Sequence, residues 1–249
     1  MFISLIIPAR NECEHIDEAV KRCVAELRDL QQSFEVIVVD DHSSDNTFAQ
    51  AQQLQDQYPE LRVLRGSLGS GKGAAVLFGI LESEGTHVAY LDADLEYDPH
   101  ELIRMIRLND PIGPQGPAIV ATRVGDSRPQ LELITSKIAR WVIKMLFGLG
   151  ISDTQAGLKL LPGAPSRRAA ALTKEFGWLF DVELLWWLKV EGIALVEHKL
   201  CQKPIRRRRV GLFGIVMGFV LALKVAGRVR LAPYCSDSVL LSRVLYSKK

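Results

Sequence analysis

Residues 88–96, VAYLDADLE, contain a short apolar run that leads into three carboxylates spaced two residues apart. The run is typical of a buried β-strand, and alternate residues of an extended chain point to the same side. We therefore expect Asp92, Asp94 and Glu96 to lie on one side of the chain where the strand ends. Oxygen donors of this kind suit a hard divalent cation, Mg²⁺ or Mn²⁺, which usually also binds substrate phosphates. The stretch predicts a metal site for a phosphorylated ligand, and a solvated acidic turn is the alternative.

Similar units of strand followed by helix surround this stretch. Short apolar runs predict strands at residues 3–7, 34–39, 61–64, 88–91 and 118–122. Helical patterns cover residues 15–30, 74–82, 99–107 and 176–189, and a polar helix runs to residue 57 after capping residues 43–47. Repeated units of this kind imply an α/β fold with a mostly parallel, doubly wound sheet flanked by helices.

Polar clusters follow the predicted strands. They occupy residues 10–12, 40–41, 69–73 and 92–96. In open parallel sheets, ligands bind beyond the carboxyl ends of the strands. The clusters therefore predict one binding site along that edge of the sheet.

Composition narrows the class of protein. The chain has 249 residues, 48% of them apolar and 24% charged, which allows one large or two small globular domains. The net charge of +2 gives no reason to expect a nucleic-acid partner. The four cysteines show no CxxC spacing, and residues 1–7 lack the basic region of a signal peptide. A reduced, cytoplasmic setting is expected.

The glycine-rich stretch 66–73 resembles a phosphate-binding loop only in part. Gly66, Gly71 and Lys72 match the start of the P-loop pattern, but Gly73 replaces the hydroxyl residue that would bind Mg²⁺. A P-loop ATPase is therefore rejected. Lys72 at the start of a helix can still meet an anion, and an ordinary turn is the alternative.

Several motifs together resemble the family-2 glycosyltransferases, which have the GT-A fold. They are PARNE at 8–12, VVDDHSSDNT at 38–47, GKG at 71–73 and DAD at 92–94. Two later motifs, DTQAGLK at 153–159 and FDVEL at 180–184, resemble the branch that loads sugars onto polyprenyl phosphates. That branch includes the dolichyl-phosphate glucosyl- and mannosyltransferases, and the glucosyl enzymes are the closer match.

The resemblance implies roles for individual residues. The nucleotide-sugar set is Pro8, Arg10, Glu12, Val39, Asp40, Asp41, Lys72, Asp92 and Ala93. The metal set is Asp92, Asp94 and Glu96, for Mn²⁺ or Mg²⁺. The catalytic set is Asp94, Arg123 and Asp153, and the acceptor-side set is Gln155, Lys159 and Glu183.

The implied reaction moves a sugar, with UDP-glucose the favoured donor, onto a polyprenyl phosphate with inversion at the anomeric carbon. A phosphate oxygen is already ionised at neutral pH and needs no strong base, so we expect Asp153 to orient the acceptor or the sugar rather than remove a proton. A soluble enzyme with a hydroxyl acceptor is the first alternative, and there Asp153 would be a base. A non-catalytic GT-A module that binds a membrane or a partner is the second.

The C-terminal part predicts contact with a membrane surface. Residues 210–223 carry no charge, yet a span needs about 20 apolar residues. The basic residues 206–209 precede this run, and together they indicate an in-plane helix over anionic headgroups, with residues 131–149 as its partner. Core helices with basic ends are the alternative. We expect a catalytic domain over residues 1–205 and an interfacial segment over 206–249, peripheral on the cytosolic face of a membrane.

Two further expectations concern single groups. The branch usually carries a basic residue followed by Gly-Ser-Lys near the end of the catalytic domain. In that region this chain has four arginines at 206–209, followed by Val-Gly, and lacks the Ser-Lys. Trp178, Trp186 and Trp187 are expected to pack in the core, because large aromatic side chains bury well.

Overall fold

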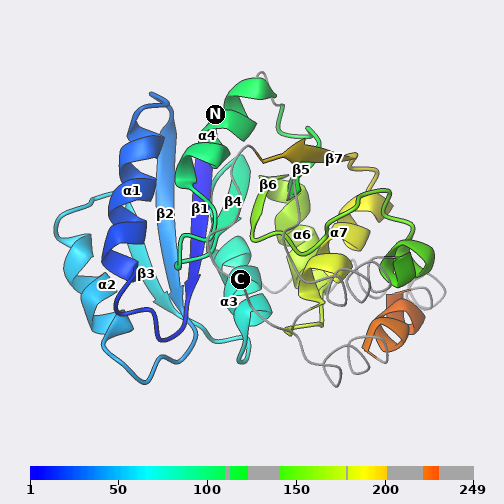
Figure 1. Cartoon of the computed structure of the whole chain (residues 1–249), viewed down its shortest axis with the longest axis horizontal. Coiled ribbons are helices and arrows are strands. Elements are labelled where there is room, and N and C mark those ends of the chain that lie inside the picture. The colour runs from blue at the N-terminus through cyan, green and yellow to red at the C-terminus, as the bar shows by residue number, and fades with distance from the viewer. Residues whose placement is uncertain (110–112, 123–140, 178, 201–220, 230–249) are drawn as a thin grey trace, which may run out of the picture.

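The computed structural model describes residues 1–109, 113–122, 141–177, 179–200 and 221–229 (Figure 1). Its centre is a seven-stranded sheet in the order β3-β2-β1-β4-β6-β5-β7. Strand β6 pairs antiparallel with both β4 and β5, and the other pairings are parallel. The predicted mostly parallel α/β sheet is confirmed.

The strands are β1 (Phe2–Ala9), β2 (Ser33–Asp40), β3 (Leu61–Arg65), β4 (His87–Leu91), β5 (Ala118–Thr122), β6 (Leu158–Pro162) and β7 (Leu195–Lys199). The helices are α1 (Ile16–Arg28), α2 (Thr47–Gln55), α3 (Lys72–Glu82), α4 (Pro99–Leu108), α6 (Gly163–Leu172) and α7 (Phe180–Val190), and residues 141–147 and 221–229 are also helical. All five predicted strands are present, and the ends of four of them shift by one or two residues.

The sheet separates two hydrophobic cores. Along β1, Ile3, Leu5 and Ile7 belong to the core shared with α1, α2 and α4, whereas Ile6 belongs to the core shared with α3, α6 and α7. Alternate strand residues point to opposite faces, so a strand that is apolar at every position feeds both cores. The seven residues from Ile3 to Ala9 are buried, as expected of a central strand.

The structure differs from the predictions after residue 150. Strands β6 and β7 and helix α6 were not predicted. Strand β6 begins inside the motif at 153–159 and ends in Pro, β7 has three polar residues in five, and α6 begins with Gly-Ala-Pro. Helix α7 begins at Phe180 rather than at residue 176. The backbone N–H groups of Lys174 and Glu175 donate to the Glu183 carboxylate instead of entering a helix. Side-chain bonds of this kind compete with helical ones.

The helices 141–147 and 221–229, which fall in the stretches predicted to lie on a membrane surface, are partly buried in the core. Ile143 and Phe147 of helix 141–147 pack in the same cluster as Val225 and Val229 of helix 221–229. For these side chains the core alternative holds, while Trp141 is 62% exposed. Residues 131–140 and 206–220, on which the rest of the interfacial prediction depends, lie outside the described residues.

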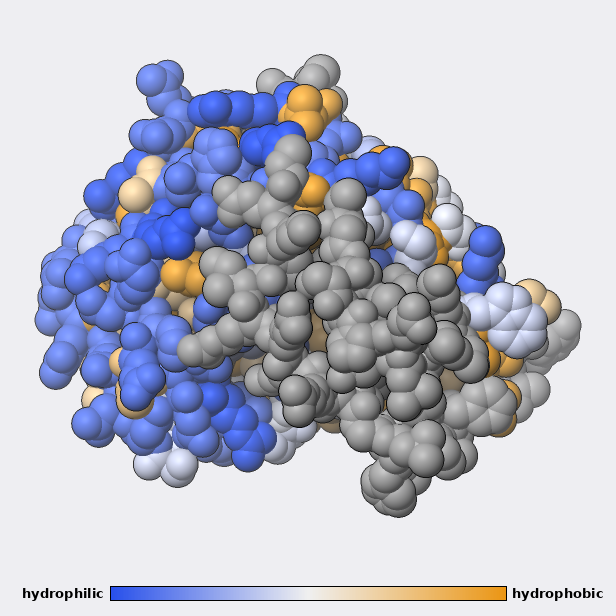
Figure 2. Space-filling model, viewed as in Figure 1, coloured by the Kyte–Doolittle hydropathy of each residue, from blue (hydrophilic) through white to orange (hydrophobic). Residues whose placement is uncertain are grey.

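The hydropathy of the surface differs between the two ends of the molecule. Figure 2 shows a mostly hydrophilic surface over α1 and α2, and more hydrophobic residues toward the opposite end of the molecule. No helix within the described ranges combines the length and the apolar character that crossing a membrane requires. Trp186 and Trp187 pack against the core with their rings 4.8 Å apart, which confirms the packing prediction for these two, and Trp178 lies outside the described residues.

Candidate active site

Five chain segments meet at one edge of the sheet. Strands β3, β2, β1 and β4 are neighbours and parallel, so their carboxyl ends and the polar clusters that follow them lie side by side. Strand β6 runs the opposite way, and Leu158 at its start pairs with Leu91 at the end of β4. The antiparallel pairing therefore brings the loop 153–157, with its predicted acceptor-side residues, to the same edge.

The loops after β1 and β2 are joined by Asn11. Its backbone N–H donates to Ser43 Oγ (3.0 Å), and its side-chain oxygen accepts from the backbone N–H of Ser44 (2.8 Å). Asn11 and His42 both have positive φ, 55° and 54°, which is uncommon for residues other than glycine. Backbone strain of this kind collects at functional sites. Asn11 was not among the predicted site residues, although it lies inside one of the motifs.

Asp40 and Asp41 form the buried floor of this part of the site. Asp41 Oδ2 accepts from the backbone N–H of Gly71 (2.9 Å) and from Arg10 (3.3 Å). Asp40 Oδ2 accepts from the backbone N–H of Ser43 (3.3 Å). The Oδ1 atom of each is buried without a hydrogen bond among the described residues. Buried carboxylate oxygens are costly when unpaired, so these two are suited to accept from a bound ligand.

The predicted nucleotide-binding residues of β1 and β2 lie next to each other. Pro8 and Val39 are paired in the sheet register, and both are buried. Arg10 also donates to Ser70 Oγ (3.1 Å), which links the first loop to the glycine-rich loop. The backbone N–H of Glu12 donates to Thr47 Oγ1 (2.8 Å). The structure thus brings this predicted set together.

The glycine-rich loop places Lys72 beside Asp92. Gly71 has a φ of 115° and precedes α3, which begins at Lys72. The Lys72 ammonium lies 2.6 Å from Asp92 Oδ1 and 2.8 Å from Oδ2. Burial works to lower the pKa of Lys72, but the carboxylates of Asp92 and Asp181 outweigh it, and the pKa is raised. Lys72 therefore carries its positive charge at the edge of the site.

The three carboxylates after β4 are not arranged as we expected. Strand β4 ends at Leu91, and a turn follows in which the N–H of Leu95 donates to the Asp92 carbonyl and Leu95 has a φ of 54°. The prediction that Asp92, Asp94 and Glu96 share one side of an extended chain is wrong, because the chain is no longer extended there. Asp94 Oδ1 accepts instead from the N–H of Glu96 (3.1 Å). The buried Ala93 lies between the two aspartates.

The donor set fits a divalent cation that also binds the substrate. Within the described residues, no three His, Cys, Asp or Glu side chains form a group that could hold a metal ion on their own. Mg²⁺ in enzymes, however, is commonly held by one or two carboxylates together with substrate phosphates and waters. Asp92 and Asp94 supply two such carboxylates with hard oxygen donors. The Lys72 ammonium already lies beside Asp92, so a positive charge is favoured at this position.

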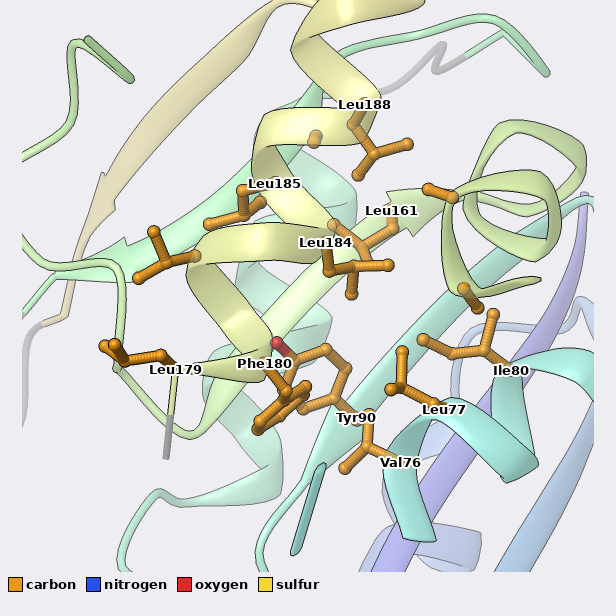
Figure 3. Close-up of a cluster of buried hydrophobic side chains, with 14 of the residues drawn as sticks. Val76, Leu77, Ile80, Tyr90, Leu161, Leu179, Phe180, Leu184, Leu185 and Leu188 are labelled. Atoms are coloured by element: carbon orange, nitrogen blue, oxygen red, sulfur yellow. The ribbon is translucent and has the colours of Figure 1, made fainter. Parts of the chain in front are cut away.

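A buried charged network lies behind Asp92. Lys159 of β6 is fully buried, 3.0 Å from Asp181 of α7, and donates to the Ala156 carbonyl (2.7 Å). The hydroxyl of Tyr90, which pairs with Lys159 across the strands, donates to Asp181. Figure 3 shows the Tyr90 ring between Val76 and Phe180. Burial lowers the pKa of Lys159, although Asp181 opposes this, and burial followed by the Asp181 charge raises the pKa of Tyr90.

The loop before β6 packs directly on Asp92. A Cβ at Gly157 would lie 2.5 Å from Asp92 Oδ2, so only glycine allows this approach without a shift. Asp153 is buried, and its Oδ1 accepts from the N–H of Gln155 (3.2 Å). Asp153 and Gln155 thus lie in the loop that contacts the predicted metal ligand.

Other predicted residues are placed differently. Lys159 and Glu183 are enclosed by protein groups, so neither presents its charge to solvent at the edge of the sheet. Arg123 follows β5, which ends at the same edge as β4, but Arg123 lies outside the described residues. Glu96 is partly buried next to Asp94.

One family model matches more than half of the chain. Residues 4–147 match the model of glycosyl transferase family 2. The chain is 32% identical, over 91% of its length, to dolichyl-phosphate beta-glucosyltransferase ALG5C of Trichomonas vaginalis and spans 71% of that protein. It is 37% identical, over 43% of its length, to dolichol-phosphate mannosyltransferase of Pyrococcus furiosus but spans only 29% of it.

Solved structures share the fold. Glucosyl-3-phosphoglycerate synthase from Mycobacterium tuberculosis, crystallised with Mn²⁺, UDP and glucosyl-3-phosphoglycerate, superposes with a TM-score of 0.62 at 20% identity. The match covers 91% of this chain and 80% of that one. The same enzyme was also crystallised with Mg²⁺ and UDP. At this identity the likeness concerns the fold, and the predicted GT-A architecture is confirmed.

Proposed function

The chain belongs to glycosyl transferase family 2, and we propose that it transfers a hexose from a nucleotide sugar to the phosphate of a polyprenyl lipid. The observation that carries the proposal is the similarity to a dolichyl-phosphate beta-glucosyltransferase over 91% of the chain. UDP-glucose is the donor that we favour, because that relative is a glucosyltransferase and the solved neighbour contains UDP.

The nucleoside binds along the ends of β1 and β2. The Oδ1 atoms of Asp40 and Asp41 accept hydrogen bonds from its N–H or O–H groups. Among the described residues neither atom accepts a hydrogen bond, and His42 Nδ1 lies 3.5 Å from Asp41 Oδ1. Arg10, which is held by Asp41 and Ser70, lies at the rim of this pocket. Binding satisfies the buried oxygens, so it recovers free energy that the free protein lacks.

The diphosphate lies near Asp92, Asp94 and Lys72. Asp92 and Asp94 would hold a divalent cation, Mn²⁺ or Mg²⁺, which would supply positive charge to offset the charge that develops on the departing nucleotide. The Lys72 ammonium adds positive charge next to Asp92. Arg123 adds a further cation from the end of β5. These groups stabilise the leaving diphosphate.

The acceptor approaches from the loop 153–157. Its phosphate oxygen is ionised at neutral pH, so Asp153 orients the acceptor and the sugar and does not have to remove a proton. Gln155 supplies an amide for the same purpose. Direct attack on the anomeric carbon inverts it and gives a β-linked lipid phosphate sugar from an α-linked donor. Lys159 and Glu183, being enclosed, act on this loop and on α7 rather than on the acceptor.

The protein acts as a peripheral enzyme on the cytosolic face of a membrane. Trp141 and Met145 are 62% and 64% exposed, and Leu223 is 47% exposed next to the exposed Lys224. Exposed apolar side chains beside lysines suit an anionic bilayer surface. In this arrangement the helix 221–229 packs with residues 1–205 through the buried Val225 and Val229, and the exposed Trp141, Met145 and Leu223 are the side chains that meet the lipid.

A transfer assay with liposomes tests the proposal. Purified protein is mixed with Mn²⁺, liposomes that contain a polyprenyl phosphate, and radiolabelled UDP-glucose, GDP-mannose or UDP-N-acetylglucosamine. We expect label in the organic phase from UDP-glucose, and loss of that label when EDTA is added. Asp94→Asn should lower transfer at least a hundredfold, about 2.7 kcal/mol of transition-state stabilisation. Asp17→Asn, in an exposed pair with Lys21, is the control.

The two alternatives predict other results. A soluble enzyme with a hydroxyl acceptor would release UDP only with sugar acceptors, and Asp153→Asn would then abolish activity as the loss of a base does. A non-catalytic module would give no turnover with any donor. Either result would contradict the polyprenyl phosphate proposal.

A further inference from the structure

The helix 221–229 is tied to α7 by one buried ion pair. Arg228 is 31% exposed at its side chain, and its guanidinium lies 2.5 Å from Glu183 Oε2. Glu183 is 1% exposed, so its charge depends on partners supplied by the protein. The pair joins two elements that are 45 residues apart in the sequence.

The same carboxylate oxygen holds a loop. Glu183 Oε2 also accepts from the backbone N–H of Glu175 (2.9 Å) and of Lys174 (3.3 Å). Loss of Arg228 leaves this buried carboxylate with two amide donors and with no ion pair to another part of the chain that the structure describes. Its position relative to the loop 173–177 then has to change, because an uncompensated buried charge is strongly unfavourable.

That loop in turn supports the glycine-rich loop of the site. A Cβ at Gly73 would lie 2.5 Å from the Phe176 carbonyl oxygen, and one at Gly71 would lie 3.1 Å from it. The Phe176 ring lies 3.5 Å from the corresponding position at Gly69. Phe176 therefore packs directly against the glycine-rich loop, through its carbonyl group and its ring.

We infer that Arg228 is a positioning residue for the glycine-rich loop, acting through Glu183 and Phe176. The backbone N–H of Gly71 donates to Asp41, and Lys72 contacts Asp92. A shift of Phe176 therefore disturbs both the nucleoside end and the diphosphate end of the site. The helix 221–229 thereby influences the affinity for the donor without contacting the donor. This inference rests on the proposed function only in its choice of nucleotide probe.

Two measurements on the full chain test it. Hydrogen exchange of the peptide that covers residues 66–76 is compared between wild type and Arg228→Gln. We expect exchange about 3- to 30-fold faster in the variant, the range found for residues that couple through packed networks. UDP affinity in Mn²⁺, measured by calorimetry, should fall by a similar factor, and Arg228→Lys should recover part of it.

The control variant is Arg168→Gln. Arg168 pairs in two hydrogen bonds with Glu191, which follows the C-terminal end of α7, whereas Glu183 lies near the start of that helix. It should change neither quantity. Phe176→Ala leaves the ion pair intact and removes the ring that contacts Gly69, so it should reproduce the donor defect even if Arg228→Gln folds poorly.

The outcomes separate the two proposals. Unchanged exchange at residues 66–76 in both Arg228→Gln and Phe176→Ala would overturn the positioning role, whatever the protein binds. Wild-type protein that binds neither UDP nor GDP would overturn the proposed donor, while faster exchange in the two variants would still support the positioning role.

Discussion

Asp181→Asn should destabilise the protein strongly. The substitution removes the carboxylate that lies 3.0 Å from the Lys159 ammonium, and Lys159 has no exposed surface through which water could replace it. The remaining partners include the Ala156 carbonyl and the Tyr90 ring, whose centroid is 5.0 Å away, and the charge of Asp153 also favours the protonated Lys159. Breaking one side of a buried ion pair costs about 3–5 kcal/mol. For a chain of this size that corresponds to a fall in Tm of roughly 6–20 °C.

The loss should depend on pH in a defined direction. Because burial lowers the folded-state pKa of Lys159 below 10.5, the folded protein binds fewer protons than the unfolded chain between that lowered value and 10.5. Stability therefore rises with pH across this window. Asp181 raises the pKa of Lys159, so its loss extends the window to lower pH. The deficit of Asp181→Asn should shrink as pH rises from 7 to 9.5, below the range in which Tyr90 titrates.

Urea unfolding followed by tryptophan fluorescence measures this deficit at each pH. The double variant Lys159→Met with Asp181→Leu should lie close to wild type, because replacing a whole buried pair by apolar groups is often neutral. Asp17→Asn should leave the midpoint unchanged. A deficit of Asp181→Asn below about 1 kcal/mol at pH 7, or one that grows with pH, would refute the idea that Asp181 compensates a buried cation.

Two further predictions concern single positions. Gly157→Ala places a Cβ 2.5 Å from Asp92 Oδ2, so it should cost about 1–3 kcal/mol of stability and lower transfer at least tenfold. Urea unfolding and the transfer assay measure the two effects. Gly227→Ala is the control and should change neither quantity, because no described atom lies within 4 Å of the new Cβ. The pKa of Asp45 is lowered from 3.8 to about 2, chiefly because the Thr47 hydroxyl donates to it. Its stabilisation is therefore present above pH 3.8 and lost as pH falls toward 2, so urea midpoints of wild type and Asp45→Asn should converge over that range.

Much of the fold followed from local pattern. Apolar runs of four to six residues between polar clusters correspond to β1 to β5 in the structure. The helix expected at 15–30 is α1, because its apolar residues repeat at helical spacing along one buried face. The edge that carries the site followed from the rule that parallel strands end together. Motif resemblance then predicted which side chains at that edge bind the donor.

Only the tertiary structure decided how distant parts meet. Leu95 has a positive φ of 54°, which is not expected of a leucine. The carboxylates around this turn could therefore not be placed from their spacing in the sequence. The reversed direction of β6, which sets Gly157 against Asp92, depends on pairing with β4 about 70 residues earlier in the chain.

The long-range ion pairs were equally hidden in the sequence. Lys159 matched an acceptor-side motif, yet Asp181 and Tyr90 enclose it, and Arg228 joins Glu183 from the far end of the chain. The sequence by itself determined the strands β1 to β5 and the polar edge, because these depend on neighbours a few residues apart. The structure decided which charges are buried together, because that depends on contacts between segments that share no local pattern.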